Sequence, residues 1–514
     1  MNAPIRGGAP PARRWLVLAV LGGSLVLTGL DTTVLNVALP TLVGELGATT
    51  SGLQWIVDSY ALMAGSLMLF CGSLADRLGR KWVYLSGLVL FTASSVAAAY
   101  ADSVAALIMA RGAMGVGEAL LMPATLAIIA SIFPKGPERT KAIGIWSAAV
   151  GVGTVLGPMA GGWLLNHFWW GSVFLINLPI GLAIVLATVF LVPNSRARQI
   201  RRPDVPGALL SVTAVGCLLW AVIEGPDRGW TSVPVLGGMA AGAVLVGAFI
   251  AWQWHSRAPM LPLSIFRHRA LAAGDLLILL GAFSLIGMLF VVVQHLQFVL
   301  GYSAGETGLR LGPAALALLI AGPLAGVLAP RLGMRAVAVA GLTCLGAALA
   351  VLGTATAEDG YGRVLVSLLL LGTGAGFVIT STSDAIIGSL PENDLGVGAA
   401  TNSASLQLGA ATGVAVLGSL LNSGYRADLD QDLGRTAPPE LLDAARESLG
   451  TALTAAAKLP GEAGAAFADT ARRAFTDGMG SAMAAGTGVC ALGIVLALCL
   501  APSRPRDRRP KDPS

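Results

Sequence analysis

Long apolar runs constrain this chain of 514 residues more than any other feature of its sequence. A helix needs about 20 mostly apolar residues to cross a bilayer, where every backbone polar group must find its partner inside the protein. By this rule the sequence predicts fourteen membrane-spanning helices, and therefore an all-α polytopic membrane protein. The predicted spans are 15–39, 52–74, 82–101, 104–132, 141–165, 171–192, 206–224, 235–254, 270–300, 306–329, 335–353, 363–389, 396–421 and 482–502.

Composition agrees with lipid as the main solvent. Only 12% of the residues are charged, whereas soluble proteins average about 25%. The 5 cysteines all fall within apolar runs, so we expect neither a structural disulfide nor a metal site. The apolar run that begins at Trp15 is too long for the core of a cleavable signal peptide.

Basic residues predict the orientation of the spans. They gather in alternate connections, and this pattern places those connections and both termini in the cytoplasm. The short connections on the other side hold little beyond Arg228 and Arg363. The basic residues of the predicted cytoplasmic connections and tail are Arg77, Arg80, Lys81, Lys135, Arg139, Lys141, Arg196, Arg198, Arg201, Arg202, Arg257, Arg267, Arg269, Arg331, Arg335, Arg504, Arg506, Arg508, Arg509 and Lys511.

An internal repeat divides the chain. Residues 75–88 (ADRLGRKWVYLSGL) recur as 329–342 (APRLGMRAVAVAGL), and AIIASIFP, ending at Pro134, recurs as AIIGSLP, ending at Pro391. Both offsets are close to half the chain, which predicts two related six-helix bundles that face each other across a midplane site. The predicted parts are a cytoplasmic N-terminus (1–14), an N-terminal bundle (15–192), linkers with two extra transmembrane helices (193–269), a C-terminal bundle (270–502) and a basic cytoplasmic tail (503–514).

The last bundle contains one long connection. Residues 422–480 are rich in alanine and in charges of both signs, and we expect them to form an extracytoplasmic loop. Within it, 439–457 and 463–477 have the periodicity of short amphipathic helices. The loop either caps the outer vestibule or is a tolerated insertion.

Four motifs occupy defined places in the predicted spans. Gly72–Lys81 (GSLADRLGRK) links the second and third spans, and Leu30–Pro40 (LDTTVLNVALP) lies in the first. Arg111 opens a fourth-span motif that continues at 121–129, and the fifth span carries a glycine pattern at 153–162. Together with the repeat, these motifs resemble the fourteen-helix drug:proton antiporter branch of the major facilitator superfamily. Within that branch, the resemblance is strongest to the subgroup that exports quaternary ammonium compounds and other lipophilic cations.

Two of these motifs have predicted mechanical roles. The charged side chains of the first loop are expected to pair when the cytoplasmic side is closed. The fifth-span glycines recur every four residues and predict a groove for close helix packing, which acts either as a hinge and proton seal or as ordinary packing. The gating motif comprises Gly72, Asp76, Arg77, Gly79, Arg80 and Lys81, and the antiporter motif comprises Gly153, Gly157, Pro158, Gly161 and Gly162.

Ionisable groups inside a membrane are costly, so each is a functional hypothesis. Asp31 and Arg111 are predicted at similar depth, and Glu118 lies two helical turns beyond Arg111, near the midplane. Burial favours the protonated acid and a nearby arginine favours the charged one, and a proton switch needs this competition. We therefore assign proton coupling to Asp31, with Arg111 as its partner and Glu118 as a second acid; the alternative is a permanent Asp31–Arg111 pair.

Other polar groups are candidates for contact with substrate. Asp58, with Trp55 and Tyr60 close by, suits an organic cation through charge and cation–π attraction, although the same residues also fit an interfacial aromatic belt. Glu118 is a further candidate for neutralising a cationic substrate. In the second half, Asp275 and Asp384 are either functional acids or solvated groups at the cytoplasmic edge, and His295 is expected to be structural.

The function that the resemblance implies is proton-coupled export of lipophilic drugs or antibiotics, cations above all, across the bacterial cytoplasmic (inner) membrane, which confers resistance. The alternative is a dedicated exporter of one endogenous metabolite, such as a self-made antibiotic. We expect no enzymatic activity, because no P-loop or catalytic triad is evident in the sequence. The expected partners are the lipid bilayer and small lipophilic substrates, with no nucleic acid, no cofactor other than protons as the coupling ion, and a monomeric chain.

Overall fold

The computed structural model describes residues 11–133, 137–195, 203–389, 395–433, 438–459 and 462–501, and all regular structure in these ranges is helical. The elements are α1 (Pro11–Leu46), α2 (Thr50–Leu78), α3 (Arg80–Ala99), α4 (Val104–Ile132), α5 (Pro137–His167), α6 (Ser172–Leu175), α7 (Asn177–Leu191), α8 (Val205–Arg228), α9 (Val233–His255), η1 (Leu263–Arg267), α10 (Arg269–Gln294), η2 (His295–Val299), α11 (Ala304–Arg310), α12 (Gly312–Leu332), α13 (Met334–Gly353), α14 (Tyr361–Ser389), α15 (Leu395–Leu433), α16 (Pro439–Glu447), α17 (Leu449–Ala456) and α18 (Glu462–Leu500). The predicted features that lie outside the described residues are Pro134, Lys135, Arg196, Arg198, Arg201, Arg202, Pro391, most of segment 1–14 and the tail 503–514.

The helices have the lengths that a bilayer requires. Within the described ranges, 13 helical segments are long and apolar enough to cross a membrane, which confirms the all-α polytopic architecture. The remaining predicted span, 141–165, falls in α5, a helix of 31 residues in which several side chains lie outside those described. Two of the predicted spans are interrupted helices, because short turns divide α6 from α7 and α11 from α12.

The sequence repeat is also a repeat of structure. Gly79 ends α2 with φ 114°, and its counterpart Gly333 ends α12 with φ 87°. Only glycine adopts such angles without strain, so each copy can pass directly into the next helix. Gly87 and Gly341 correspond in the same way, because a Cβ added at either would lie 2.8 Å from a backbone oxygen of the next helix.

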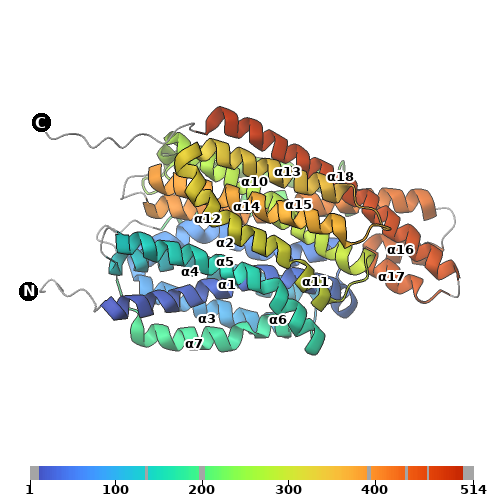
Figure 1. Cartoon of the computed structure of the whole chain (residues 1–514), viewed down its shortest axis with the longest axis horizontal. Helices are drawn as coiled ribbons and strands as arrows, with labels where there is room; N and C mark the ends of the chain where they lie inside the picture. Colours follow the sequence, from blue (N-terminus) through green and yellow to red (C-terminus); the bar gives the residue numbers. More distant parts are fainter. Residues whose placement is uncertain are drawn as a thin grey trace, which may run out of the picture.

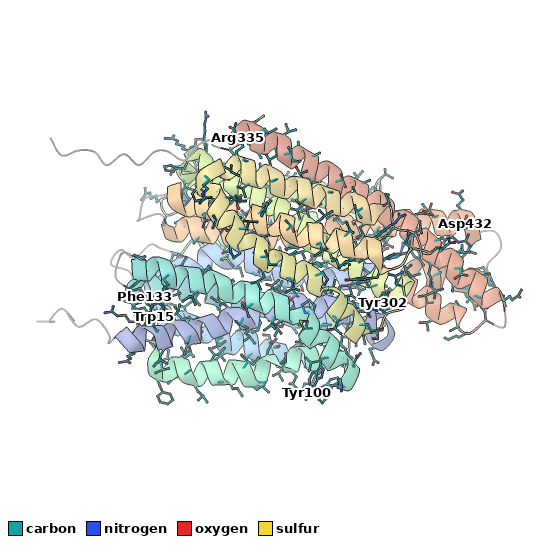
Figure 2. The ribbon with its side chains drawn as sticks, viewed as in Figure 1. Trp15, Tyr100, Phe133, Tyr302, Arg335 and Asp432 are labelled. Carbon is teal, nitrogen blue, oxygen red and sulfur yellow. The ribbon has the colours of Figure 1, made fainter. Side chains whose placement is uncertain are left out.

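The helices form two groups that lie side by side (Figure 1). Helices α1 to α7 lie along one side of the molecule and α10 to α15 with α18 along the other, and we call these groups the N-terminal and C-terminal halves. The start of α1 and the end of α18 lie at the same end of the molecule, which we call the terminus end. Figure 2 shows Trp15, Phe133 and Arg335 towards the terminus end and Tyr100, Tyr302 and Asp432 towards the opposite, far end.

Two additional helices, α8 and α9, form an insert between the halves in the sequence. They pack against each other, and α8 also contacts α2 of one half and α15 of the other. The carboxylate of Asp204, just before α8, accepts hydrogen bonds from Trp252 Nε1 (2.8 Å), Gln253 Nε2 (2.9 Å) and two backbone amides. Burial alone would raise the pKa of Asp204, but these hydrogen bonds outweigh it and lower the pKa, so the charged carboxylate holds the insert together.

The segment predicted as a long loop is largely helical. Helix α15 continues to Leu433 and α18 already begins at Glu462, so the second predicted amphipathic helix, 463–477, is the first part of a 39-residue helix. The first, 439–457, is divided at Ser448, whose Oγ accepts a hydrogen bond from the Thr451 amide and starts α17. We call residues 422–433, α16, α17 and 462–481 the far-end cap.

Candidate functional site

A buried ion pair lies in the core of the N-terminal half. Arg111 Nη1, from α4, donates to Asp31 Oδ2, from α1, at 2.6 Å, and the two side chains are 2% and 0% exposed. Asn177 Nδ2, from α7, donates to the other carboxylate oxygen at 2.9 Å. Arg111 also donates to the backbone oxygen of Ile56, from α2, and lies 4.2 Å from the centre of the Tyr60 ring. The Asp31–Arg111 pair thus joins four helices, and both oxygens of Asp31 have partners.

Glu118 connects the two halves near the middle of the bundle. Its side chain is buried, and its Oε2 accepts a hydrogen bond of 2.6 Å from Gln407 Nε2, which belongs to α15. Because the two residues come from different halves, the bond can last only while the halves are close together at this level.

Asp58 lies apart from the ion pair, on α2. The side chain is 0% exposed, and neither carboxylate oxygen has a hydrogen-bond partner among the described residues. Trp55, one turn earlier, is half-buried and packs against α8 and α15. Tyr60 instead faces the Arg111 guanidinium. The three residues that the sequence grouped as a cation site therefore divide between two environments, and their contact with substrate remains a prediction.

The antiporter motif in α5 serves two helix contacts. A Cβ added at Gly153 or Gly157 would overlap the α1 backbone at Val26 or the Thr33 hydroxyl, so this face of α5 sits directly against α1. Gly162, on the adjacent face, approaches Ala304 of α11 in the other half, where an added Cβ would lie 2.8 Å from the Ala304 backbone oxygen. The last two motif residues, Pro158 and Gly161, contact Gly308 of α11 and Val34 of α1, respectively. The groove predicted from the sequence is present, and it extends to the boundary between the halves.

The gating motif forms a bonded cluster at the terminus end. Arg80 Nη2 and Nε donate to Asp76 Oδ1 at 2.9 and 3.1 Å, and Arg80 Nη1 donates to Ala127 O of α4 at 3.0 Å. Lys81 Nζ donates to Val189 O near the end of α7. The loop charges thus pair with one another and with neighbouring helix ends. The remaining motif residues differ in exposure: Arg77 is exposed, Gly79 is buried, and Gly72 packs on Pro123.

The acids of the C-terminal half do not form a cluster with those of the first. Asp275 in α10 is 6% exposed, and its carboxylate oxygens have no hydrogen-bond partner among the described residues. Asp384 in α14 is exposed, and His295 is fully buried in the π-helical turn η2. No group of three or more potential metal ligands occurs in the part of the chain that the structure describes.

Amide side chains that the sequence did not single out carry much of the contact between the halves. Gln54 Nε2 of α2 donates to the backbone oxygens of Val414 and Ala415 of α15, each at 3.0 Å. Gln297 Nε2 donates to Val37 O of α1 at 2.9 Å. Gln407 likewise bonds to Glu118 across the boundary, whereas Asn177 bonds to Asp31 within the N-terminal half. Each is an amide within an apolar run, which is the one signal that could have identified it.

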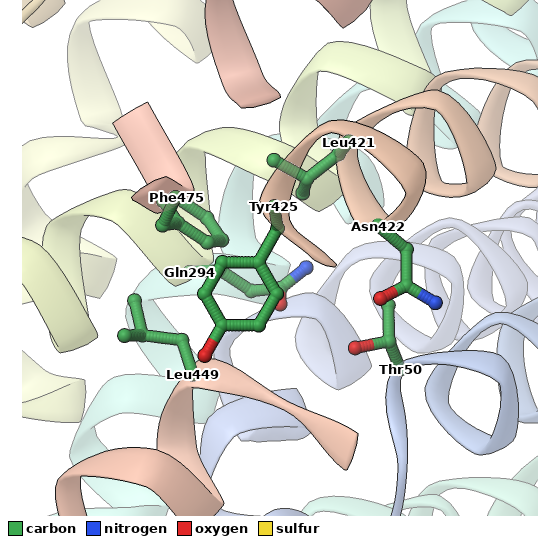
Figure 3. Close-up of a pocket in the computed structure, with 7 residues that line it drawn as sticks. All are labelled: Thr50, Gln294, Leu421, Asn422, Tyr425, Leu449 and Phe475. Atoms are coloured by element: carbon green, nitrogen blue, oxygen red, sulfur yellow. The ribbon is translucent and has the colours of Figure 1, made fainter. Parts of the chain in front are cut away.

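A small pocket lies beneath the far-end cap (Figure 3). Its volume of about 10 Å³ has room for roughly one water molecule. None of the predicted site residues lines it, so it is not the substrate cavity in this conformation. Its lining residues are Thr50, Gln294, Leu421, Asn422, Tyr425, Leu449 and Phe475.

Two helical halves joined by a repeat, with buried charges within and between them, define a secondary transporter. The chain belongs to the Major Facilitator Superfamily, whose family model matches residues 21–414. It is 37% identical to the multidrug resistance protein Stp of Mycobacterium tuberculosis, over 82% of this chain and 79% of Stp. It is 36% identical to the multidrug efflux pump LfrA of Mycolicibacterium smegmatis, over 95% of each chain.

Other relatives are antibiotic exporters, and solved structures share the fold. The tetracenomycin C resistance and export protein of Streptomyces glaucescens is 32% identical, over 97% of this chain and 94% of that protein. A bacterial homologue of the human lysosomal transporter Spinster, in an inward-facing and unoccupied conformation, superposes with a TM-score of 0.65 at 17% identity, over 96% of this chain and 98% of that chain. At this identity the likeness establishes the fold alone.

Proposed function

We propose that this protein is a proton-coupled antiporter that exports lipophilic drugs or antibiotics, cations above all, and so confers resistance. Curated relatives that match nearly the whole chain are named for drug efflux and antibiotic resistance, which supports this substrate class. The observation that carries the proposal is the buried carboxyl of Glu118 at the boundary between the halves, bonded to Gln407. An acid in this place can exchange a proton for a cation as the halves separate.

We assign the terminus end to the cytoplasm. The basic residues at that end, among them Arg80, Lys81 and Arg335, favour this orientation by the positive-inside rule. A monomeric chain in the bacterial cytoplasmic membrane, with both termini inside, fits the proposed export. No cofactor beyond the coupling proton is needed, and the function is transport rather than catalysis.

The proton-coupling groups in this proposal are Asp31, Arg111 and Glu118. Asp31 is the carrier, and Arg111 competes with the proton for its carboxylate. Glu118 is the acid nearest to substrate, with Asp58, Trp55 and Tyr60 as further contacts once the halves move. Asp275 and Asp384 are second-half acids that face neither of these groups in this conformation.

Proton flux in proteoliposomes tests the proposal. A pH-sensitive dye inside the vesicles should report proton movement when ethidium or methyl viologen is added to a reconstituted sample. Glu118→Gln should abolish the response to cations, and Asp31→Asn should abolish all coupled flux. The matched control is Asp384→Asn, which removes an exposed acid. No substrate-evoked proton movement for any compound in a broad panel would contradict antiport.

A dedicated exporter of one metabolite is the second candidate. Relatives that include the tetracenomycin C resistance and export protein and a probable actinorhodin transporter support it. The breadth of the panel separates the two functions, because a multidrug exporter responds to several unrelated cations and a dedicated one to a single compound class.

A further inference from the structure

The boundary between α2 and α15, which we call the α2–α15 seam, contains a buried acid without a partner. Asp58 is 0% exposed, and neither of its carboxylate oxygens accepts a hydrogen bond from a described residue. The ion pair of Asp31 and the Glu118–Gln407 bond leave Asp58 out. Its burial therefore has no compensating interaction in the described structure.

Helical spacing places Asp58 inside the seam. Gln54, one turn before Asp58, donates a hydrogen bond to the α15 backbone. Gly65, two turns after Asp58, packs closely against α15, because a Cβ added there would lie 3.2 Å from the Cβ of Gln407. Residues four and seven apart lie on one face of a helix, so Asp58 faces α15 between these two contacts. Ala61 and Leu62, on the same face, pack against α15 and against Leu219 of α8. Helix α8 of the insert thus covers the α2–α15 seam from outside.

Among the described residues of α4, α8 and α15, which make the most extensive contacts with α2, none offers Asp58 a free positive charge. Helix α15 has no ionisable side chain from 397 to 424. On α4, Arg111 is committed to Asp31, and Glu118 is itself an acid. On α8, Glu224 is paired with Arg228. A charged Asp58 would therefore be a carboxylate buried without a partner.

A carboxylate in that position costs several kcal/mol, whereas the neutral acid costs far less. We propose that Asp58 is a proton-binding site that controls the far-end gate: α2 and α15 close over it only when it carries a proton. This inference rests on the proposed function in one respect, namely that the seam opens and closes during transport. Opening hydrates the group and lets it ionise, so proton loss favours separation at the far end.

This assignment gives a specific reason why a proton and a cationic substrate exclude each other. In the open seam, the ionised Asp58 attracts a cation. In the closed seam, the same site holds a proton and no cation. A proton that reaches Asp58 from the far end therefore displaces the cation there and closes the seam behind it, which is the direction of proton movement that antiport requires.

The test measures the far-end distance between the halves without any substrate. Spin labels go on cysteines at Gly44 and Gly360 in a background without the native cysteines, because neither glycine has a neighbour within 4 Å of an added Cβ. In lipid nanodiscs, the ratio of open to closed molecules should rise with pH, by up to tenfold per pH unit where Asp58 titrates. Asp58→Asn should stay closed and lose this pH dependence.

Two further variants keep the test sharp. Asp275→Asn removes a second buried acid whose carboxylate oxygens have no hydrogen-bond partner among the described residues. This acid lies within one half, so the variant should respond to pH like the wild type. Asp58→Glu keeps an ionisable group and should retain the response with a shifted midpoint, which also covers the case in which Asp58→Asn does not fold. Three outcomes would each overturn the inference. The pH response could persist in Asp58→Asn, its midpoint could be unchanged in Asp58→Glu, or the wild type could show no pH response.

The two proposals fail in different assays. If the seam responds to pH through Asp58 but the protein transports no drug, the inference about Asp58 stands and the proposed substrate class is refuted. Substrate-evoked proton flux that continues in Asp58→Asn would leave antiport intact and refute Asp58 as the gate.

Discussion

Asp31 differs from the buried acids Asp58 and Asp275 in having a hydrogen-bond partner for each carboxylate oxygen. The pair with Arg111 is almost completely shielded from solvent, with side chains 0% and 2% exposed. Removal of one member of such a pair leaves a buried charge uncompensated, which costs about 3–5 kcal/mol. We predict that Asp31→Asn lowers the free energy of unfolding by about this amount and that adding Arg111→Gln restores part of it. Chemical denaturation of the purified protein measures both changes.

Transport assays on Asp31→Asn and on the double variant distinguish a loss of stability from a loss of proton coupling. The double variant should fold and still fail to couple protons if Asp31 is the carrier. Asp384→Asn, the exposed control, should leave the free energy of unfolding within about 0.5 kcal/mol of the wild type. A double variant that is less stable than Asp31→Asn alone would contradict the pairing argument.

At the scale of the element, the packing of α5 depends on glycines, which have no side chain. The glycines that face α1 let two backbones approach more closely than any side chain would permit. An added methyl at Gly157 would overlap the Thr33 hydroxyl and lie 2.8 Å from Leu30 O. We predict that Gly157→Ala destabilises the protein by about 1–3 kcal/mol, as overpacking does, and reduces transport. Thermal unfolding in detergent and the proteoliposome assay measure the two effects.

The same helix supplies the control. An added Cβ at Gly151 has no neighbour within 4 Å. Gly151→Ala should therefore leave both stability and transport close to the wild type, because it gains helix propensity without a clash. Equal effects at the two positions would show that backbone flexibility, and not close packing, is what α5 requires.

For the whole molecule, the architecture could be predicted from the sequence because a bilayer requires long apolar helices. The site was less predictable because it depends on how side chains of different helices pack together. Apolar length identified the spans, and the repeat of Gly79 at Gly333 indicated the duplication. The far-end cap was expected as a loop because the length rule applies only inside lipid. Gln54 and Gln407 escaped notice because an amide in an apolar run has no defined role until its partner on another helix is known.

The insert is bonded unequally to the two halves. Its far end is joined to the C-terminal half by the Asp227–Arg426 ion pair of 2.6 Å and by the Trp230–Ser423 hydrogen bond of 3.1 Å. Its cluster contacts with α2 are apolar, such as Leu219 with Leu62. Apolar surfaces slide more readily than ion pairs break, so we predict that the insert moves with the C-terminal half.

Two label pairs test this prediction. The distance from Gly247 in α9 to Gly326 in α12 should stay constant when substrate or pH changes the conformation, whereas the distance from Gly247 to Gly151 in α5 should change. An added Cβ at each of these glycines meets nothing within 4 Å, so labels fit without displacing neighbours. The opposite result would assign the insert to the N-terminal half.

The position of α8 also decides how the protein meets its lipids. Two lateral boundaries separate the halves, one at α2 and α15 and the other at α5 with α11 and α12. Helix α8 covers the first, whereas α5 and α12 present exposed apolar side chains such as Met159 and Ile320 beside the second. We therefore expect a compound dissolved in the membrane to approach the space between the halves from the α5–α12 side. On this expectation, α8 makes lateral entry from the bilayer one-sided, although the two halves are built on the same repeat.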